Sequence, residues 1–270
     1  MTGQGPRIFP TTLTRSRLSP SRHPNERGLS LRKLLIALAS AFAVTAFPAA
    51  AGAGATSSGT LRFAPNKKIT QSTSSNWSGY AATGGGFRSV TSNWIQPTAS
   101  CGAATTYSSF WVGLDGDGSS TVEQTGTSAD CSGGSPRYYA WYEMYPKYPV
   151  NLSLAVRAGD SITGTVTVGS NNRYTLTIRN NTTGGSFSTT VKGHGANYSA
   201  EAIAEAPSSR SGVLPLTNFG TVGFSGTLVN GQPIGSFGPD RIDMVSGSTL
   251  KAQTSGLSGG TNFSVAWKHS

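Results

Sequence analysis

Few side chains in this sequence could carry out catalysis, and this scarcity limits the reactions open to the protein. Asp and Glu together number 11 in 270 residues, and His numbers three. Beyond residue 55 the histidines are His194, between two glycines, and His269, next to the C-terminus. A Ser–His–Asp triad needs a histidine held between its two partners, so these positions disfavour that chemistry. Carboxyl and amide side chains remain as candidates for acid–base catalysis.

Several of these side chains fall in short aromatic-rich segments that predict β-strands. Because successive side chains of a strand point to opposite faces, Glu123 and Gln124 are expected on opposite faces. A single acid is most simply explained as a polar residue on the solvated face of a strand. The alternation nevertheless places three sets of side chains together, each on one face: Trp111 with Asp115; Trp141 with Glu143 and Tyr145; and Glu201 with Glu205.

The rest of the chain from Asn76 onward predicts many short strands. Runs rich in Val, Ile, Thr and aromatic residues are separated about every ten residues by Gly, Asn, Ser or Pro, and apolar and polar residues alternate in 161–168. Many short strands at even spacing indicate an antiparallel sandwich or barrel. We therefore expect an all-β fold, with residues 72–270 forming one domain.

Residues 1–55 have the composition of an export signal. Seven basic residues precede an apolar run over 34–47, and small residues follow up to Ala55. This order is typical of a secretory signal peptide, and the run is shorter than the ~20 residues of a spanning helix. We expect cleavage near residue 55, a pro-segment or loose tail over 56–71, and a secreted product without stable membrane association.

The basic charge of the chain lies mainly in this N-terminal part. The formal net charge is +10, but Arg62, Lys67, Lys68 and the seven basic residues of 1–55 account for most of the excess. The remaining domain is close to neutral, so we expect no nucleic-acid partner.

The two cysteines, Cys101 and Cys131, both follow the export signal. In an oxidising compartment we expect them to form a disulfide, with a stabilisation of ~3–4 kcal/mol in the chain-entropy model. Two cysteines and two histidines at these spacings do not make a zinc site, so no metal is expected.

Six segments occur in an order that resembles one known family. They are Ser75–Tyr80 (S-N-W-S-G-Y), Trp94–Pro97 (W-I-Q-P), Trp111–Asp117 (W-V-G-L-D-G-D), Glu123–Gly126 (E-Q-T-G), Tyr139–Pro146 (Y-A-W-Y-E-M-Y-P) and Ala200–Glu205 (A-E-A-I-A-E). Over about residues 75–267 the chain resembles the glutamic peptidases (eqolisins, peptidase family G1), which are fungal acid proteases with bacterial relatives.

The resemblance implies a β-sandwich of two antiparallel seven-stranded sheets, of the concanavalin or jelly-roll type, and a catalytic Gln/Glu dyad. The family's glutamine matches Gln124 and its glutamate matches Glu205. The residues that line or support the substrate cleft match Trp111, Asp115, Glu143 and Tyr145. The resemblance implies a secreted, pepstatin-insensitive acid endopeptidase that acts on polypeptides without a cofactor, and we expect a monomer. The sequence departs from fungal members at Ala206-Pro207, where they carry an acid and an aromatic residue.

The dyad makes chemical sense for these residue types. Glu205 would take a proton from a water held between it and Gln124, and the Gln124 amide would stabilise the oxyanion. A carboxylate base of ordinary pKa ~4.3 works at pH values where histidine is already protonated.

Two other functions remain open on the sequence. One is a lectin-like carbohydrate-binding module that uses exposed tryptophans as stacking platforms: Trp77, Trp94, Trp111 and Trp141. The other is a glycosidase with two carboxyl groups, such as Glu143 and Glu205, at a separation of ~5–5.5 Å or ~6.5–9.5 Å.

Overall fold

The computed structural model describes Leu61 and residues 73–270, and this part of the chain is built almost entirely from β-strands. The predictions of a signal peptide over 1–55 and of a pro-segment over 56–71 lie outside the described residues, apart from Leu61. Two short 3-10 helices, η1 (Ser170–Asn172) and η2 (Ile234–Phe237), are present among the strands. The all-β prediction for the domain is confirmed.

The strands are, in chain order, β1 (Thr73–Ser74), β2 (Trp77–Thr83), β3 (Ser89–Ile95), β4 (Ser109–Leu114), β5 (Val122–Ser132), β6 (Ser135–Tyr145), β7 (Val150–Asn151), β8 (Ser161–Val168), β9 (Arg173–Asn180), β10 (Ser186–Lys192), β11 (Ser199–Glu205), β12 (Ser208–Ser209), β13 (Gly212–Val213), β14 (Thr221–Val229), β15 (Gln232–Pro233), β16 (Asp240–Ser246), β17 (Thr249–Thr254) and β18 (Phe263–Trp267).

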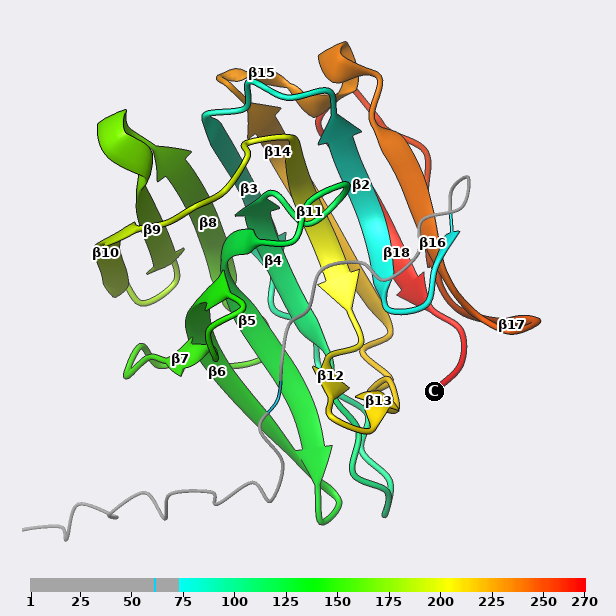
Figure 1. The fold of residues 1–270 in the computed structure, drawn as a ribbon. Helices are drawn as coiled ribbons and strands as arrows, with labels where there is room; N and C mark the ends of the chain where they lie inside the picture. Colours follow the sequence, from blue (N-terminus) through cyan, green and yellow to red (C-terminus); the bar gives the residue numbers. More distant parts are fainter. Residues whose placement is uncertain (1–60, 62–72) are drawn as a thin grey trace, which may run out of the picture. The chain divides into compact units, whose positions relative to one another are not determined.

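The strands form two packed layers (Figure 1). Layer A has the order β10-β9-β8-β3-β14-β18-β17, and layer B continues as β16-β2-β11-β4-β5-β6-β7. Strands β4 and β5 of layer B contact β8 and β9 of layer A, although they are not neighbours in the hydrogen-bonded order. Every neighbouring pair along this order is antiparallel, as expected for a sandwich.

The prediction of two separate seven-stranded sheets is not confirmed, because β16 joins the layers. Residues 240–242 pair with β2 of layer B, whereas residues 244–246 pair with β17 of layer A. The register with β17 shifts between Met244 and Val245, which marks an irregularity in the strand. A bulge lets one strand bend and change sheets. The hydrogen-bonded order is therefore continuous around the corner that β16 makes.

Burial differs between the two layers. In β8 and β9 of layer A, buried side chains alternate with partly buried or exposed ones, as their sequences predict. In β4 and β11 of layer B, every residue is buried. The inner face of layer B packs against layer A, with Val112 and Ile162 in one cluster. Its other face carries a second apolar group, the outer cluster: Trp77, Ala81, Trp111, Val122, Trp141, Ile203 and Ile242.

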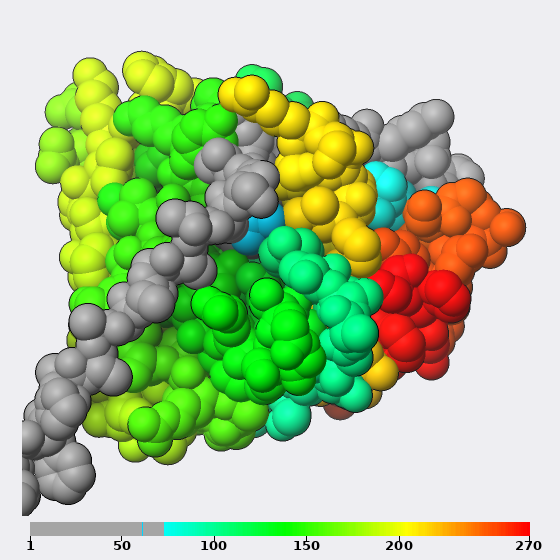
Figure 2. Space-filling view, turned by 90° about the horizontal axis from the view of Figure 1, so that it is seen from below, coloured from blue at the N-terminus to red at the C-terminus, as the bar shows by residue number. Residues whose placement is uncertain are grey.

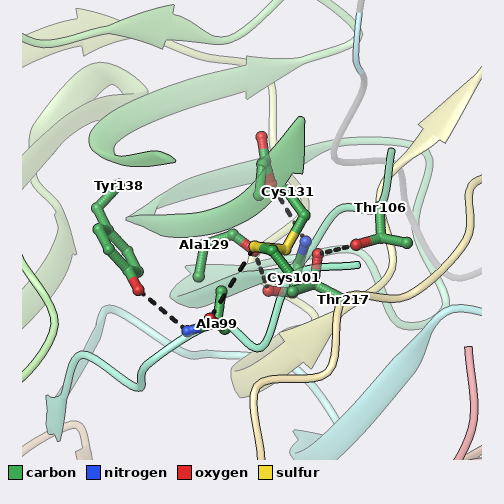
Figure 3. Close-up of a disulfide and its surroundings, with 9 residues drawn as sticks. Ala99, Cys101, Thr106, Ala129, Cys131, Tyr138 and Thr217 are labelled. Atoms are coloured by element: carbon green, nitrogen blue, oxygen red, sulfur yellow. Dashed lines mark hydrogen bonds between the residues drawn. A yellow bond between two sulfur atoms is a disulfide. The ribbon is translucent and has the colours of Figure 1, made fainter. Parts of the chain in front are cut away.

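The disulfide between Cys101 and Cys131 is present, as predicted (Figure 3). It ties the segment before β4 to the far end of β5, where Thr106 and Cys131 also exchange two backbone hydrogen bonds of 3.1 and 2.9 Å. Figure 2 views this end of the domain, with the green turn between β5 and β6 beside the teal segment that precedes β4. The cross-link thus closes the end of the longest hairpin, β5–β6.

A buried pair of carboxyl groups, Asp115 and Glu123, anchors the segment that leads into β11. Asp115 follows β4 directly with a positive φ of 67°. Its carboxylate accepts hydrogen bonds from the backbone N–H groups of Asn197 and Tyr198, both at 2.8 Å. A carboxylate that accepts two backbone N–H groups in this way fixes the path of the loop.

Gly195 lies against this pair. A side chain at this position would collide with the carboxyl groups of Asp115 and Glu123 and with the hydroxyl of Tyr174. Burial and then the charge of Asp115 raise the pKa of Glu123 to about 8. Glu123 therefore keeps its proton at neutral pH, and in that form it can donate a hydrogen bond to Asp115.

Replacing both cysteines by serine should lower the free energy of unfolding by ~3–4 kcal/mol, because the open chain gains the entropy of an unclosed loop. Urea unfolding of the wild type and of the double variant at one pH measures the difference. Equal stability of the two proteins would contradict this expectation.

The substitution Glu123→Gln should flatten the dependence of stability on pH. A carboxyl group whose pKa is raised on folding destabilises the protein as the pH rises above its unfolded value of ~4.3, by about 1.4 kcal/mol for each pH unit until the folded value is passed. For Glu123 this window runs up to about 8. Urea unfolding at several pH values between 5 and 8 should give a smaller loss of stability in the variant, and equal slopes would rule out this role.

Candidate active site

The register of four neighbouring strands in layer B brings the predicted catalytic residues onto one face. Gln124 on β5 pairs with Gly113 on β4 and with Glu143 on β6. Glu205 ends β11, where it pairs with Ser109 on β4 and with Trp77 on β2. In Figure 1, β11 lies between β2 and β4, with β5 and β6 beyond. These side chains share the face of the outer cluster.

Two side-chain N–H groups hold the carboxylate of Glu205. The indole Nε1 of Trp111 donates to its Oε2 at 2.8 Å, and the amide Nδ2 of Asn76 donates to its Oε1 at 3.3 Å. The Ser74 hydroxyl in turn donates to Oδ1 of Asn76 at 3.1 Å, which orients the amide. N–H donors stabilise a carboxylate in its ionised form, and Glu205 is fully buried among them.

The amide of Gln124 is oriented by Glu143. Its Nε2 donates to Oε2 of Glu143 at 2.8 Å, and both side chains are fully buried. The amide nitrogen carries two hydrogens, so it can donate to a second acceptor while it bonds to Glu143. The hydrogen bond to Glu143 therefore orients the amide without using all of its donor capacity.

Trp111 bonds to one member of the predicted dyad and lies near the other. Its Nε1 bonds to Glu205, while its six-membered ring lies where a Gly113 side chain would be, only 2.9 Å from an added Cβ. The same Cβ would be 3.1 Å from Cβ of Gln124. The ring of Trp77 packs edge-on against Trp111 with 4.9 Å between centroids. Only glycine at position 113 leaves room for the indole beside Gln124.

The strand register sets the separation of the two catalytic candidates. Gln124 and Glu205 are two strands and four residues apart, which corresponds to about 16 Å between Cα atoms at ~4.8 Å per strand and ~3.3 Å per residue. Both are long side chains on one face, and Trp111 lies between their rows in the register. Glu143 and Glu205 are three strands and four residues apart, which is wide for a pair of glycosidase carboxyls.

Most of the predicted site residues come together, but Asp115 does not. Hydrogen bonds join Trp111 to Glu205 and Gln124 to Glu143 on one face, and Tyr145 packs against the outer cluster. The expectation that Asp115 shares a face with Trp111 is wrong, because its positive φ breaks the alternation of the strand. Its carboxylate lies with Glu123 and supports the loop before β11.

Sequence reasoning assigned no role to Asn76, which the structure places on Glu205. The available signal was its position directly before Trp77 in the first aromatic motif, where a short amide can reach across to the neighbouring strand. Sequence reasoning also assigned no role to Ser109 of β4, which pairs with Glu205 of β11 in the strand register.

Glu201 shares the face of Glu205 but has a different environment. Burial raises the pKa of Glu201 well above its ordinary range, and the Ser199 hydroxyl offsets this only in part. The pKa of nearby Asp117 rises to about 6 through burial and then through the charge of Asp240. The surroundings of Glu201 thus favour its neutral form, which does not suit the removal of a proton from water.

The tryptophans of this domain are not exposed stacking platforms. Trp77, Trp94, Trp111 and Trp141 are each at most 1% exposed. Trp94 packs between the layers, and the other three belong to the outer cluster. The lectin-like alternative therefore loses the feature that suggested it.

Within residues 73–270 there is no helix of the length and apolarity that crossing a membrane requires. The same residues contain no group of three or more His, Cys, Asp or Glu side chains placed to hold a metal ion.

Comparison with known proteins places this arrangement in a family. Aspergillopepsin-2 of Aspergillus niger is 33% identical to the chain over 153 residues, which are 54% of this chain and 54% of that protein. The chain thus matches about half the length of this relative. Scytalido-glutamic peptidase, solved with a transition state analog inhibitor, is similar with a TM-score of 0.64 and 28% identity over 72% of this chain and 98% of that chain.

A further solved structure is an Eqolisin-family peptidase in complex with the tripeptide Ala-Ile-His. It is similar with a TM-score of 0.60 and 27% identity, again over 72% of this chain and 98% of the other. The sequence pattern of the Peptidase A4 family matches residues 75–267, which is most of the chain. The resemblance predicted from the motifs is confirmed: the chain belongs to the Peptidase A4 family, the family of the glutamic peptidases.

Proposed function

We propose that this protein is a glutamic endopeptidase in which Glu205 activates water and Gln124 stabilises the oxyanion. The observation that supports this most directly is the position of Trp111, which bonds to Glu205 while packing beside Gln124. One rigid side chain thus lies between the rows of a carboxyl group and a neutral amide and holds the first by a hydrogen bond. The similar solved structures carry a transition state analog inhibitor and a tripeptide, which supports polypeptides as substrates.

The reaction follows from the roles of the two side chains. The Glu205 carboxylate takes a proton from a water, and the water oxygen attacks the carbonyl carbon of the peptide bond. The carbonyl oxygen gains the negative charge, which an N–H of the Gln124 amide stabilises. The protonated Glu205 then gives its proton to the leaving nitrogen, the C–N bond breaks, and the carboxylate is restored.

The working pH of this proposal is acidic. A carboxylate base and an amide donor keep their roles at pH values where a histidine base is protonated. The buried acids Glu123 and Glu201 also favour the folded state at low pH, because burial raises the pKa of each. Secretion of the enzyme after removal of residues 1–55, and a monomeric state, belong to the same proposal. Sequencing the N-terminus of secreted protein tests the first of these.

The substitution Glu205→Gln should lower kcat/KM for a peptide substrate roughly 1,000-fold, because it removes the base. Gln124→Ala should lower it roughly 100- to 1,000-fold, the usual cost of losing an oxyanion donor. Cleavage of denatured albumin at pH 2–5 in the presence of pepstatin measures both.

The matched control is Glu201→Gln, four residues earlier on the same face of β11. Because Glu201 is already neutral in the folded protein, this variant should keep most of the activity. Thermal unfolding of all three variants establishes that they are folded. A fully active Glu205→Gln protein would contradict the dyad.

The substitution Trp111→Phe tests the link between the two catalytic residues. It keeps an aromatic ring in the outer cluster and removes the N–H that bonds to Glu205. Hydrogen bonds to a charged group contribute ~1.5–3 kcal/mol, so kcat should fall roughly 10- to 100-fold. If kcat is unchanged while the protein remains folded, the indole N–H does not hold the base.

A further inference from the structure

Ser109 lies directly beside the proposed base, and nothing above uses its hydroxyl. It is the first residue of β4, two residues before Trp111, and therefore points to the same face of layer B. Its partner in the register on one side is Glu205 of β11, and on the other side Ser128 of β5. Side chains directly opposite one another on antiparallel strands have Cβ atoms ~4.5–5.5 Å apart.

The hydroxyl of Ser109 is buried and unsatisfied. The side chain is fully buried, and within the described part of the chain its Oγ has no hydrogen-bond partner. Its neighbours do have partners: Ser108 Oγ donates to the backbone oxygen of Ala129 at 2.7 Å, and Ser128 Oγ accepts from Nε1 of Trp141 at 3.0 Å. A buried polar group without a partner destabilises a fold, so this hydroxyl has no stabilising role in the unliganded protein.

The residue on the other side of Glu205, Trp77, also carries a buried polar group without a hydrogen-bond partner within the described residues. Trp77 of β2 flanks Glu205 on the opposite side from Ser109, and its indole Nε1 is likewise buried without a partner among residues 73–270. The proposed base therefore lies between two unsatisfied hydrogen-bonding groups. Such groups are common where a ligand completes the hydrogen bonds.

The chemistry of a peptide substrate fits this position. Every residue of a peptide offers one N–H donor and one C=O acceptor, and a hydroxyl can bond to either. Neighbouring strands lie ~4.8 Å apart, and successive Cα atoms of a substrate are ~3.8 Å apart. In a substrate that crosses the strands, a hydroxyl one strand away from Glu205 is therefore about one residue from the bond being cleaved. Ser109 is buried like Gln124 and Glu205, and it lies on the same face as both.

We propose that Ser109 Oγ hydrogen-bonds to the substrate main chain at the peptide group adjacent to the scissile bond. This inference rests on the proposed function. This contact adds a substrate-binding residue to the dyad. It recognises backbone and not side chains, so it contributes to the binding of any sequence.

The substitution Ser109→Ala separates this role from a structural one. Because the hydroxyl has no partner in the folded protein, the thermal unfolding midpoint should stay equal to that of the wild type or rise. The value of kcat/KM for a peptide substrate should fall about 3- to 10-fold. Ser108→Ala is the matched control: it removes a hydroxyl that is bonded to Ala129, so the midpoint should fall while kcat/KM per folded molecule is kept.

A binding measurement makes the test independent of turnover. The Kd of a non-cleavable, peptide-based transition-state analogue, measured by calorimetry, should rise by the same factor in Ser109→Ala. Unchanged kcat/KM and Kd, or a midpoint lowered as in Ser108→Ala, overturns the role of Ser109 and leaves the dyad intact. Activity in Glu205→Gln overturns the dyad instead, while the difference in Kd still reports on Ser109.

Discussion

The hydrogen bond from the Trp111 indole to Glu205 is the interaction on which the arrangement of the site depends. It joins neighbouring strands β4 and β11, and the same indole fills the space above Gly113 beside Gln124. Trp111 is itself held by the edge-on ring of Trp77. A buried indole has few rotamers and one N–H, so its packing determines where the carboxylate sits. The position of the Glu205 carboxyl group thereby depends on the packing of the outer cluster of layer B.

Four other buried or partly buried acids of the domain favour their neutral form, in contrast to the hydrogen-bonded Glu205. Burial raises the pKa of Glu123 to about 8, of Asp130 to about 7 and of Asp117 to about 6, and it raises that of Glu201 as well. Each of these groups destabilises the fold as the pH rises toward its folded pKa. Below that value the groups are uncharged and impose no repulsion. These four groups therefore favour the folded state more at acidic pH than at neutral pH.

The sequence predicted the composition of the site better than its geometry. The alternation of side chains correctly separated Glu123 from Gln124 and grouped Trp141 with Glu143, because these residues lie inside regular strands. It failed at Asp115, where one residue with positive φ turned the carboxylate toward Glu123. The sequence also could not predict that β16 passes from one layer to the other, because a register shift within one strand does not change the hydrophobic pattern visibly. The alternation of side chains along a strand therefore predicts their faces only as long as every backbone torsion stays in the extended region.

The two glutamates of β11 show that environment, and not spacing, separates their roles. Glu201 and Glu205 are four residues apart on one face, and both are fully buried. Glu205 receives two N–H donors, one from Trp111 and one from Asn76, so it can hold a negative charge. Glu201 lies near the acid Asp117 instead, and burial keeps it protonated. One strand thus presents two glutamates in different surroundings on the same face, and the N–H donors that favour an ionised carboxylate lie at Glu205, the residue proposed as the base.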